Sequence, residues 1–127
     1  MNAVLDASAL LAYIQHEPGS AIVSTALNDG ALISTVNWAE VIQKAHAARV
    51  EIAGLASDLV ALGLGLEPFT ADQAEIAGGL WARTKGRGLS LADRSCLAVG
   101  LDKGLPVYTA DRVWVELDLG IPITSIR

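Results

Sequence analysis

The chain has 127 residues, of which 52% are hydrophobic, and its 9 basic and 14 acidic residues give a net charge of −5. The apolar content excludes a disordered chain, and the single cysteine, Cys96, excludes a disulfide scaffold. We expect residues 1–127 to form one domain. The lone thiol and a start without a basic leader predict a cytoplasmic protein, and no apolar run is long enough to cross a membrane.

The first half of the chain predicts two strands and four helices from its apolar periodicity and its turn residues. In chain order these are a strand at 4–5, helices at 7–15 and 21–27, a strand at 31–35, and helices at 37–49 and 52–63.

The second half continues the alternation and ends on a strand. In chain order we expect a weak strand at 65–69, helices at 72–84 and 90–103, a strand at 105–109, a short helix at 113–117 and a strand at 121–124. Alternating strands and helices are typical of an α/β fold with a parallel sheet.

Four acidic residues occupy equivalent places in this pattern. Asp6 directly follows the first strand, and Asp111 follows the fourth. Glu40 and Asp93 lie in the first turns of two predicted helices. Functional groups of open parallel sheets gather outside the carboxyl ends of the strands, so we expect these side chains at one edge of the sheet.

Two interpretations of these acids stay open. Asp6 and Asp111 suit helix caps, and Asn37-x-x-Glu40 and Ser90-x-x-Asp93 resemble capping boxes. Four carboxylates brought together, however, repel one another unless a cation neutralises them. Their hard oxygen atoms suit Mg²⁺ or Mn²⁺.

The neighbouring polar residues divide into supporting and structural groups. Ser8 and Thr109 are neutral donors beside Asp6 and Asp111, where they can orient carboxylates or serve only local structure. His16 lies at the end of one predicted helix, His46 lies inside another, and Cys96 suits a small core residue, so none of the three is needed at a metal site.

Four basic residues cluster around Asp93, within residues 83–94, and they suggest a second interpretation of the acidic net charge. Without the four candidate ligands, the remaining ten acidic residues nearly balance the 9 basic ones. The cluster is either a solvated loop or a phosphate-binding rim beside a metal site that hydrolyses phosphodiesters. Its members are Arg83, Lys85, Arg87 and Arg94.

Two apolar stretches, 21–27 and 52–66, suit either packing against the sheet and a second copy of the chain, or a groove for a partner helix.

The three tryptophans suit core or interface positions, and one of them could stack on an RNA base: Trp38, Trp81 and Trp114.

Four motifs in order resemble those of the PIN-domain ribonucleases, and among them the VapC-type toxins of bacterial toxin–antitoxin pairs. The resemblance covers the whole chain. The motifs are Val4-Leu5-Asp6-Ala7-Ser8, Thr35-Val36-Asn37-Trp38-Ala39-Glu40, Leu89-Ser90-Leu91-Ala92-Asp93-Arg94 and Val107-Tyr108-Thr109-Ala110-Asp111.

The resemblance implies a three-layer α/β/α fold with a five-stranded parallel sheet in the order 3-2-1-4-5. It implies that Asp6, Glu40, Asp93 and Asp111 bind Mg²⁺ or Mn²⁺ and catalyse endonucleolytic cleavage of structured cellular RNA, of the tRNA or rRNA class. It also implies a homodimer and a VapB-type antitoxin that suppresses the activity.

Two other classes of function compete with this one. A PIN-like module that binds RNA or antitoxin without cutting keeps the same fold. A phosphatase with Asp6 as covalent nucleophile resembles the haloacid-dehalogenase enzymes, but these carry a second Asp two residues later, where this chain has Ser8. Receiver domains place their phospho-acceptor after the third strand, and the residues at 65–69 do not fit.

Overall fold

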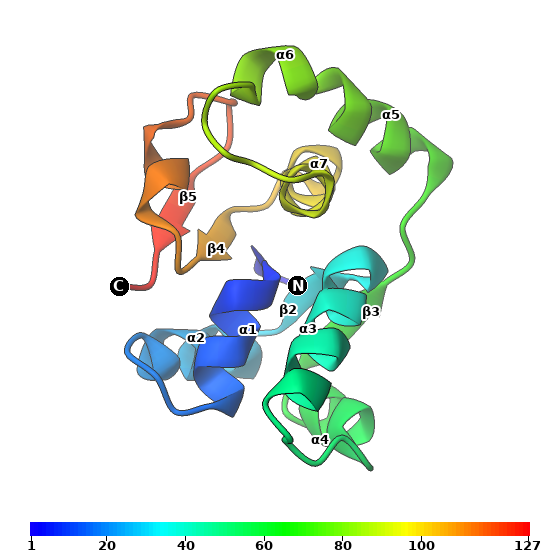
Figure 1. Ribbon diagram of the computed structural model, residues 1–127, viewed down its shortest axis with the longest axis vertical. Coiled ribbons are helices and arrows are strands. Elements are labelled where there is room, and N and C mark those ends of the chain that lie inside the picture. Colours follow the sequence, from blue (N-terminus) through cyan, green and yellow to red (C-terminus); the bar gives the residue numbers. More distant parts are fainter.

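A computed structural model of residues 1–127 shows a five-stranded, all-parallel sheet in the order β3-β2-β1-β4-β5 (Figure 1). This order confirms the expected topology. The strands are β1 (Ala3–Leu5), β2 (Ala31–Ser34), β3 (Leu64–Glu67), β4 (Val107–Thr109) and β5 (Ile123–Ser125).

Helices cover both sides of the sheet. α7, backed by α5, lies on one side, and α1 and α2 lie on the other (Figure 1). No helix is long and apolar enough to cross a membrane. The helices are α1 (Ala7–Ile14), α2 (Ser20–Asn28), α3 (Thr35–Ala47), α4 (Leu55–Ala61), α5 (Ala71–Gly79), α6 (Trp81–Thr84), α7 (Leu91–Lys103) and the 3₁₀ helix η1 (Arg112–Glu116).

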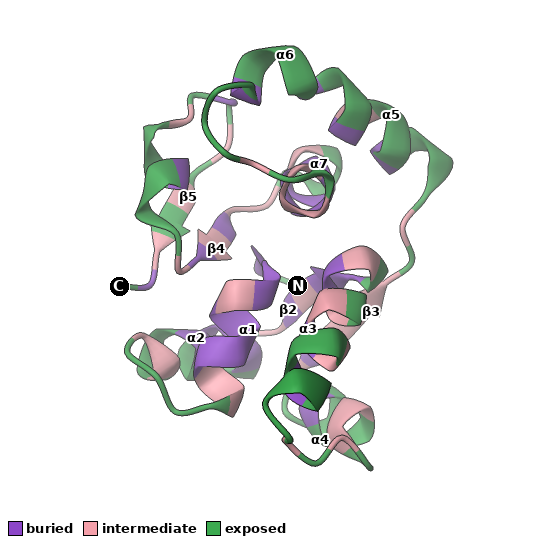
Figure 2. Cartoon of the chain, viewed as in Figure 1, coloured by how far each residue is buried: buried purple, intermediate pink, exposed green.

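The two faces of the sheet carry separate apolar cores. Val4 and Leu5 are both fully buried, but Leu5 joins the core under α1 and α2, whereas Val4 joins the core under α7. Successive strand residues point to opposite faces, so a strand covered on both sides is apolar throughout. Figure 2 shows the result, with the central strands buried and α6 largely exposed.

The order of the strands places a topological switch point between β1 and β4. The chain leaves β1 toward β2 and β3 on one side, and later returns through β4 to β5 on the other. Leu5 pairs with Tyr108, so the residues that follow them, Asp6 and Thr109, lie side by side at the carboxyl ends of β1 and β4. Ligand sites of open α/β sheets lie at such a point.

Helix α3 begins earlier than the sequence predicts. We expected the strand to run to Thr35 and Asn37 to open the helix, but the helix begins at Thr35 and Ser34 caps it by accepting a hydrogen bond from Val36 N at 3.2 Å. A serine is as good a cap as an asparagine, so Ser34 takes this role. The predicted Asn37–Glu40 capping box is therefore wrong.

The remaining differences arise at glycine and proline. The predicted helix 72–84 divides into α5 and α6 near the weak helix formers Gly78 and Gly79. The last two strands begin just after Pro106 and Pro122, which lack the N–H that a strand pairing requires. The predicted helix 52–63 shortens to α4, after Gly54 in a left-handed conformation.

Gly100 lets α7 pack closely on the sheet. A Cβ atom at this position would lie 2.6 Å from Val107 Cγ2, 2.9 Å from Ile121 Cδ1 and 3.2 Å from the Leu105 carbonyl oxygen. We predict that Gly100→Ala lowers the free energy of unfolding by about 1–3 kcal/mol, because overpacking exceeds the gain in helix propensity.

Gly78→Ala is the matched control, because Gly78 is also helical but has no atom within 4 Å of an added Cβ. It should raise the free energy of unfolding by up to about 1 kcal/mol. Urea denaturation measures both, and equal effects of the two substitutions would contradict the packing argument.

Candidate active site

The Asp6 carboxylate lies at the end of β1 and is only 5% exposed. Its Oδ1 accepts a hydrogen bond from Ala9 N at 2.8 Å, and so caps α1. Its Oδ2 accepts one from Thr109 Oγ1 at 2.6 Å. Ser8 Oγ lies 2.8 and 2.9 Å from the two oxygens. Three donors thus fix the orientation of the carboxylate.

The two hydroxyl groups also link Asp6 to the loop after β4. Ser8 Oγ accepts a hydrogen bond from Ala110 N at 2.9 Å, and Thr109 Oγ1 accepts one from Asp111 N at 3.0 Å. Each hydroxyl donates toward the carboxylate and accepts from the loop, which uses both capacities of the group. The two hydroxyls therefore fix the position of the backbone at Asp111 relative to the Asp6 carboxylate.

Burial raises the pKa of Asp6 from its ordinary 3.8 to about 6. Desolvation penalises the charged form more than the hydrogen bonds from Thr109, Ala9 and Ser8 favour it, and the negative charge of Asp93 raises the pKa further. The chain therefore holds a carboxylate whose negative charge lacks a compensating positive group.

Glu40 and Asp93 reach the same region from α3 and α7. Glu40 Oε1 accepts a hydrogen bond from Asn37 Nδ2 at 3.0 Å, and the same nitrogen donates to the Ala92 carbonyl at 2.9 Å. Asp93 forms the predicted capping box with Ser90, whose N–H donates to Asp93 Oδ2 at 2.9 Å. Asn37 thus joins Glu40 to the residue beside Asp93.

Cys96 reports the proximity of three of the acids. This thiol is fully buried, and burial raises its pKa well above the usual range. The negative charges of Asp6, Asp93 and Glu40 each raise that pKa further. Since such effects decline with distance, all three carboxylates lie within electrostatic reach of the Cys96 thiol on α7.

Asp111 is joined to Asp6 only through its backbone. Its Oδ1 accepts a hydrogen bond from Val113 N at 3.0 Å and caps η1. Its carboxylate makes no hydrogen bond to Asp6, Ser8 or Thr109, although its own N–H donates to Thr109.

Glu40, Asp93 and Asp111, called here the outer acids, share one feature: only one carboxylate oxygen of each accepts a hydrogen bond. The free oxygens, which accept no hydrogen bond within the chain, are Glu40 Oε2, Asp93 Oδ1 and Asp111 Oδ2. A capping role and a ligand role are therefore compatible in the same residue, because each uses a different oxygen.

The donor set fits a hard divalent cation in its chemistry. All candidate ligands are oxygen atoms, and the buried Asn37 Oδ1 beside Glu40 has no hydrogen-bond partner. As the side chains lie, no three acidic, histidine or cysteine groups converge closely enough to share a metal ion. Ligation by all four acids requires the free oxygens to rotate toward a common point.

The predicted basic rim is largely engaged with the protein. Arg83 donates to the Asp118 carbonyl at 2.8 Å, and Arg87 pairs with Glu116 at 3.1 Å. Lys85 Nζ lies 5.3 Å from the ring centre of Trp81, which is 55% exposed.

Arg94 differs from the other three basic residues, because its guanidinium contacts no protein group in a hydrogen bond, ion pair or cation–π contact and its buried Nε lacks a partner. It directly follows Asp93, just as Arg112 directly follows Asp111.

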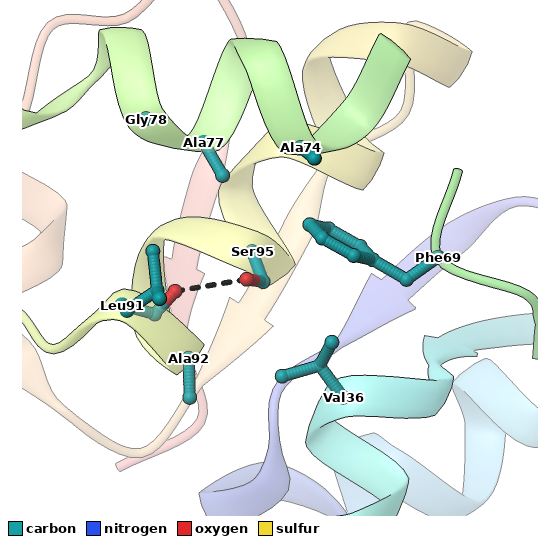
Figure 3. A pocket seen from close by; sticks show the side chains of 8 residues that line it. All are labelled: Val36, Phe69, Ala74, Ala77, Gly78, Leu91, Ala92 and Ser95. Atoms are coloured by element: carbon teal, nitrogen blue, oxygen red, sulfur yellow. Dashed lines mark hydrogen bonds between the residues drawn. The ribbon is translucent and has the colours of Figure 1, made fainter. Parts of the chain in front are cut away.

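An apolar pocket of about 470 Å³ lies beside the acids, between α3, α5 and α7. Figure 3 shows Val36 and Phe69 facing Ala74 and Ala77 of α5 across it. None of the four acidic residues lines it, so it is distinct from the candidate active site.

The PIN domain family model matches residues 3–119, and the chain therefore belongs to the PIN-domain family. PIN domains are generally nucleases, and PIN-domain nucleases generally use divalent metal ions. No curated protein sequence matches the chain significantly.

Solved structures agree on the fold. A toxin–antitoxin complex from Klebsiella pneumoniae has a TM-score of 0.75 and 20% identity over 99% of this chain and 98% of that one. DNA-bound VapBC from Salmonella typhimurium has a TM-score of 0.73 and 17% identity over 100% of this chain and 99% of that one. VapC20 from Mycobacterium tuberculosis is described as a sarcin-ricin loop cleaving toxin. It has a TM-score of 0.71 and 21% identity over 87% of this chain and 91% of that one.

We predict that Asp6→Asn stabilises the metal-free protein near pH 8 by about 3 kcal/mol, and that this gain disappears near pH 4. A raised pKa means that the folded state holds the proton more tightly than the unfolded state, so the free energy of unfolding falls as the pH rises from 3.8 to about 6 and stays at the lower level above that. Asparagine keeps an acceptor for Ala9 N and carries no charge.

Chemical denaturation in the presence of a chelator, repeated from pH 4 to pH 8, measures the effect. A stability difference that does not depend on pH would contradict the assignment of a buried, uncompensated charge to Asp6.

Proposed function

We propose that this protein is a metal-dependent endoribonuclease toxin that cleaves structured cellular RNA of the tRNA or rRNA class. The single observation that carries the proposal is the buried Asp6 carboxylate at the switch point, with three further acids near it that each keep a free oxygen. Membership of a nuclease family supports the reaction class.

In this proposal Asp6, Glu40, Asp93 and Asp111 hold Mg²⁺ or Mn²⁺. When bound, the cation supplies positive charge to the phosphodiester oxygens and lowers the pKa of a water molecule. Ser8 and Thr109 keep the Asp6 carboxylate in one orientation by donating to it. Neutralisation of the buried Asp6 charge offsets the cost that its raised pKa reveals.

RNA rather than DNA is proposed as substrate because VapC20, a structural relative, is described as cleaving the sarcin-ricin loop. Arg94, with a guanidinium free of protein partners, is the first candidate to bind phosphate beside the acids. Arg83, Lys85 and Arg87 would contribute at greater distance, since they already contact other parts of the chain.

A VapB-type antitoxin is the proposed partner, in a homodimeric and cytoplasmic toxin, because the structural relatives include toxin–antitoxin complexes. Helices α2 and α4 expose large apolar side chains at Ile22, Val60 and, just after α4, Leu62. These side chains suit the apolar face of a partner helix.

A non-cutting PIN-like module that binds RNA or antitoxin is the second candidate. The observation that favours it is that no three acidic side chains converge as they lie. The two proposals differ in one outcome, because only the nuclease produces new RNA ends.

We predict that Asp93→Asn reduces RNA cleavage at least about 100-fold while the fold survives, because metal ions supply several kcal/mol of transition-state stabilisation. The asparagine side chain keeps an oxygen that can accept from Ser90 N, so the helix cap persists. Inducible expression followed by transcriptome-wide mapping of RNA 5′ ends measures cleavage and identifies the target together.

Asp72→Asn provides the matched control, since Asp72 is an exposed acid in the first turn of α5. It should leave the pattern of RNA ends unchanged. Absence of new ends with a folded wild-type protein would favour the non-cutting module, and full cleavage by Asp93→Asn would contradict the assigned site.

For RNA binding, we predict that Arg94→Ala, made in the Asp93→Asn background, weakens the affinity for RNA. The slope of log affinity against log salt concentration should become shallower by about one, as expected for one lost phosphate contact. Arg49→Gln removes an equivalent charge from an exposed residue just after α3, nine residues from Glu40, and is the control. Fluorescence anisotropy over a salt series distinguishes them. Equal salt slopes for the two variants would remove Arg94 from the proposed RNA-binding surface.

A further inference from the structure

Asn37 is a buried bridge between two elements of the candidate active site. Its side chain is 1% exposed, in the first turns of α3, although Ser34 rather than Asn37 caps that helix. Its Nδ2 donates to Glu40 Oε1 at 3.0 Å and to the Ala92 carbonyl at 2.9 Å. The second contact spans 55 residues of sequence, so it joins α3 to the first turn of α7.

The orientation of this amide is determined by its partners. A carbonyl and an ionised carboxylate can only accept hydrogen bonds, so both must face the amide nitrogen and not the amide oxygen. Asn37 Oδ1 must then point the other way, where it is buried and lacks any partner. Burial of an unpaired carbonyl is unfavourable, so a merely structural amide would not be expected to leave it unpaired.

We propose that Asn37 is a positioning residue of the active site, which holds Glu40 by one oxygen and fixes it relative to Asp93. This inference rests on the proposed function, in which both acids are ligands. Since Nδ2 engages only Oε1 of Glu40, the other oxygen, Oε2, stays free. Because the same nitrogen binds Ala92, the residue before Asp93, the spacing of α3 and α7 at the site depends on Asn37.

The geometry corresponds to that of an outer-shell partner of a metal ligand. Such partners hydrogen-bond to ligating carboxylates, and their substitution typically weakens metal binding 10–100-fold. The unpaired Oδ1 adds an acceptor within the same buried region, which can take a hydrogen bond from a water molecule of the site.

Gln73 offers a matched comparison within the same chain. It is a second buried side-chain amide whose nitrogen donates to two acceptors, in this case the carboxylates of Glu67 at 3.1 Å and Asp102 at 3.0 Å. Asp102 lies nine residues after Asp93 along α7, which corresponds to about 14 Å of helix. Loss of Gln73 thus tests the effect of removing a buried amide bridge away from the proposed site.

The test is Mn²⁺ binding, measured by titration calorimetry on the full chain, with circular dichroism to confirm folding. We expect Asn37→Ala and Asn37→Ser to weaken Mn²⁺ binding about 10–100-fold. Asn37→Ser leaves a smaller cavity and a hydroxyl group, so it serves if Asn37→Ala does not fold. Gln73→Ala should bind Mn²⁺ as the wild type does.

Folded Asn37 variants that bind Mn²⁺ with wild-type affinity would overturn the inference, and so would an equal loss in Gln73→Ala. The proposed function has a separate readout in Asp93→Asn. If Asp93→Asn loses Mn²⁺ binding and the Asn37 variants keep it, only the positioning role fails. If the wild type binds no Mn²⁺, both proposals fail.

Discussion

The structure depends above all on a carboxylate buried at the end of its central strand. Asp6 caps α1, accepts hydrogen bonds from Ser8 and Thr109, and through them orders the loop that carries Asp111. One charged group at the switch point of the sheet therefore fixes both the start of α1 and the loop after β4. Its raised pKa shows that hydrogen bonds alone do not offset the cost of burying it. In the proposed function, a bound cation would compensate this charge.

A carboxylate has two oxygens, and this resolves the competition between capping and metal binding. Asp93 caps α7 and Asp111 caps η1, each through one oxygen, while the other stays free. If these acids bind a cation as proposed, their structural hydrogen bonds would fix the ligands in advance and so lower the entropic cost of binding. The same arrangement recurs at Glu40, where the fixed oxygen is held by the amide of Asn37.

Periodicity and turn residues predicted the alternating elements, and the resemblance predicted the strand order, which the structure confirms. The Ser90–Asp93 cap was predictable because both partners lie within one helical turn. The role of Asn37 was not, because its decisive partner, Ala92, lies 55 residues away and local patterns carry no information on such contacts. The error at Asn37 also arises from contacts that are distant in sequence. Ser34 and Asn37 are equally good N-caps, and the pairing of β2 with β3, which ends at Ser34 and Glu67, places the start of the helix at Thr35. The assignment of the four acids as ligands stays a prediction.

The most direct test of the central claim is anomalous diffraction from crystals of the protein grown with Mn²⁺. The account predicts a Mn²⁺ peak about 2.1 Å from an Asp6 oxygen and from the free oxygens of the outer acids. The hydrogen bonds of Ser90 to Asp93 and of Val113 to Asp111 should remain in place. A fully ordered site without a peak, or a peak bound only by the oxygens that cap the helices, would contradict the account.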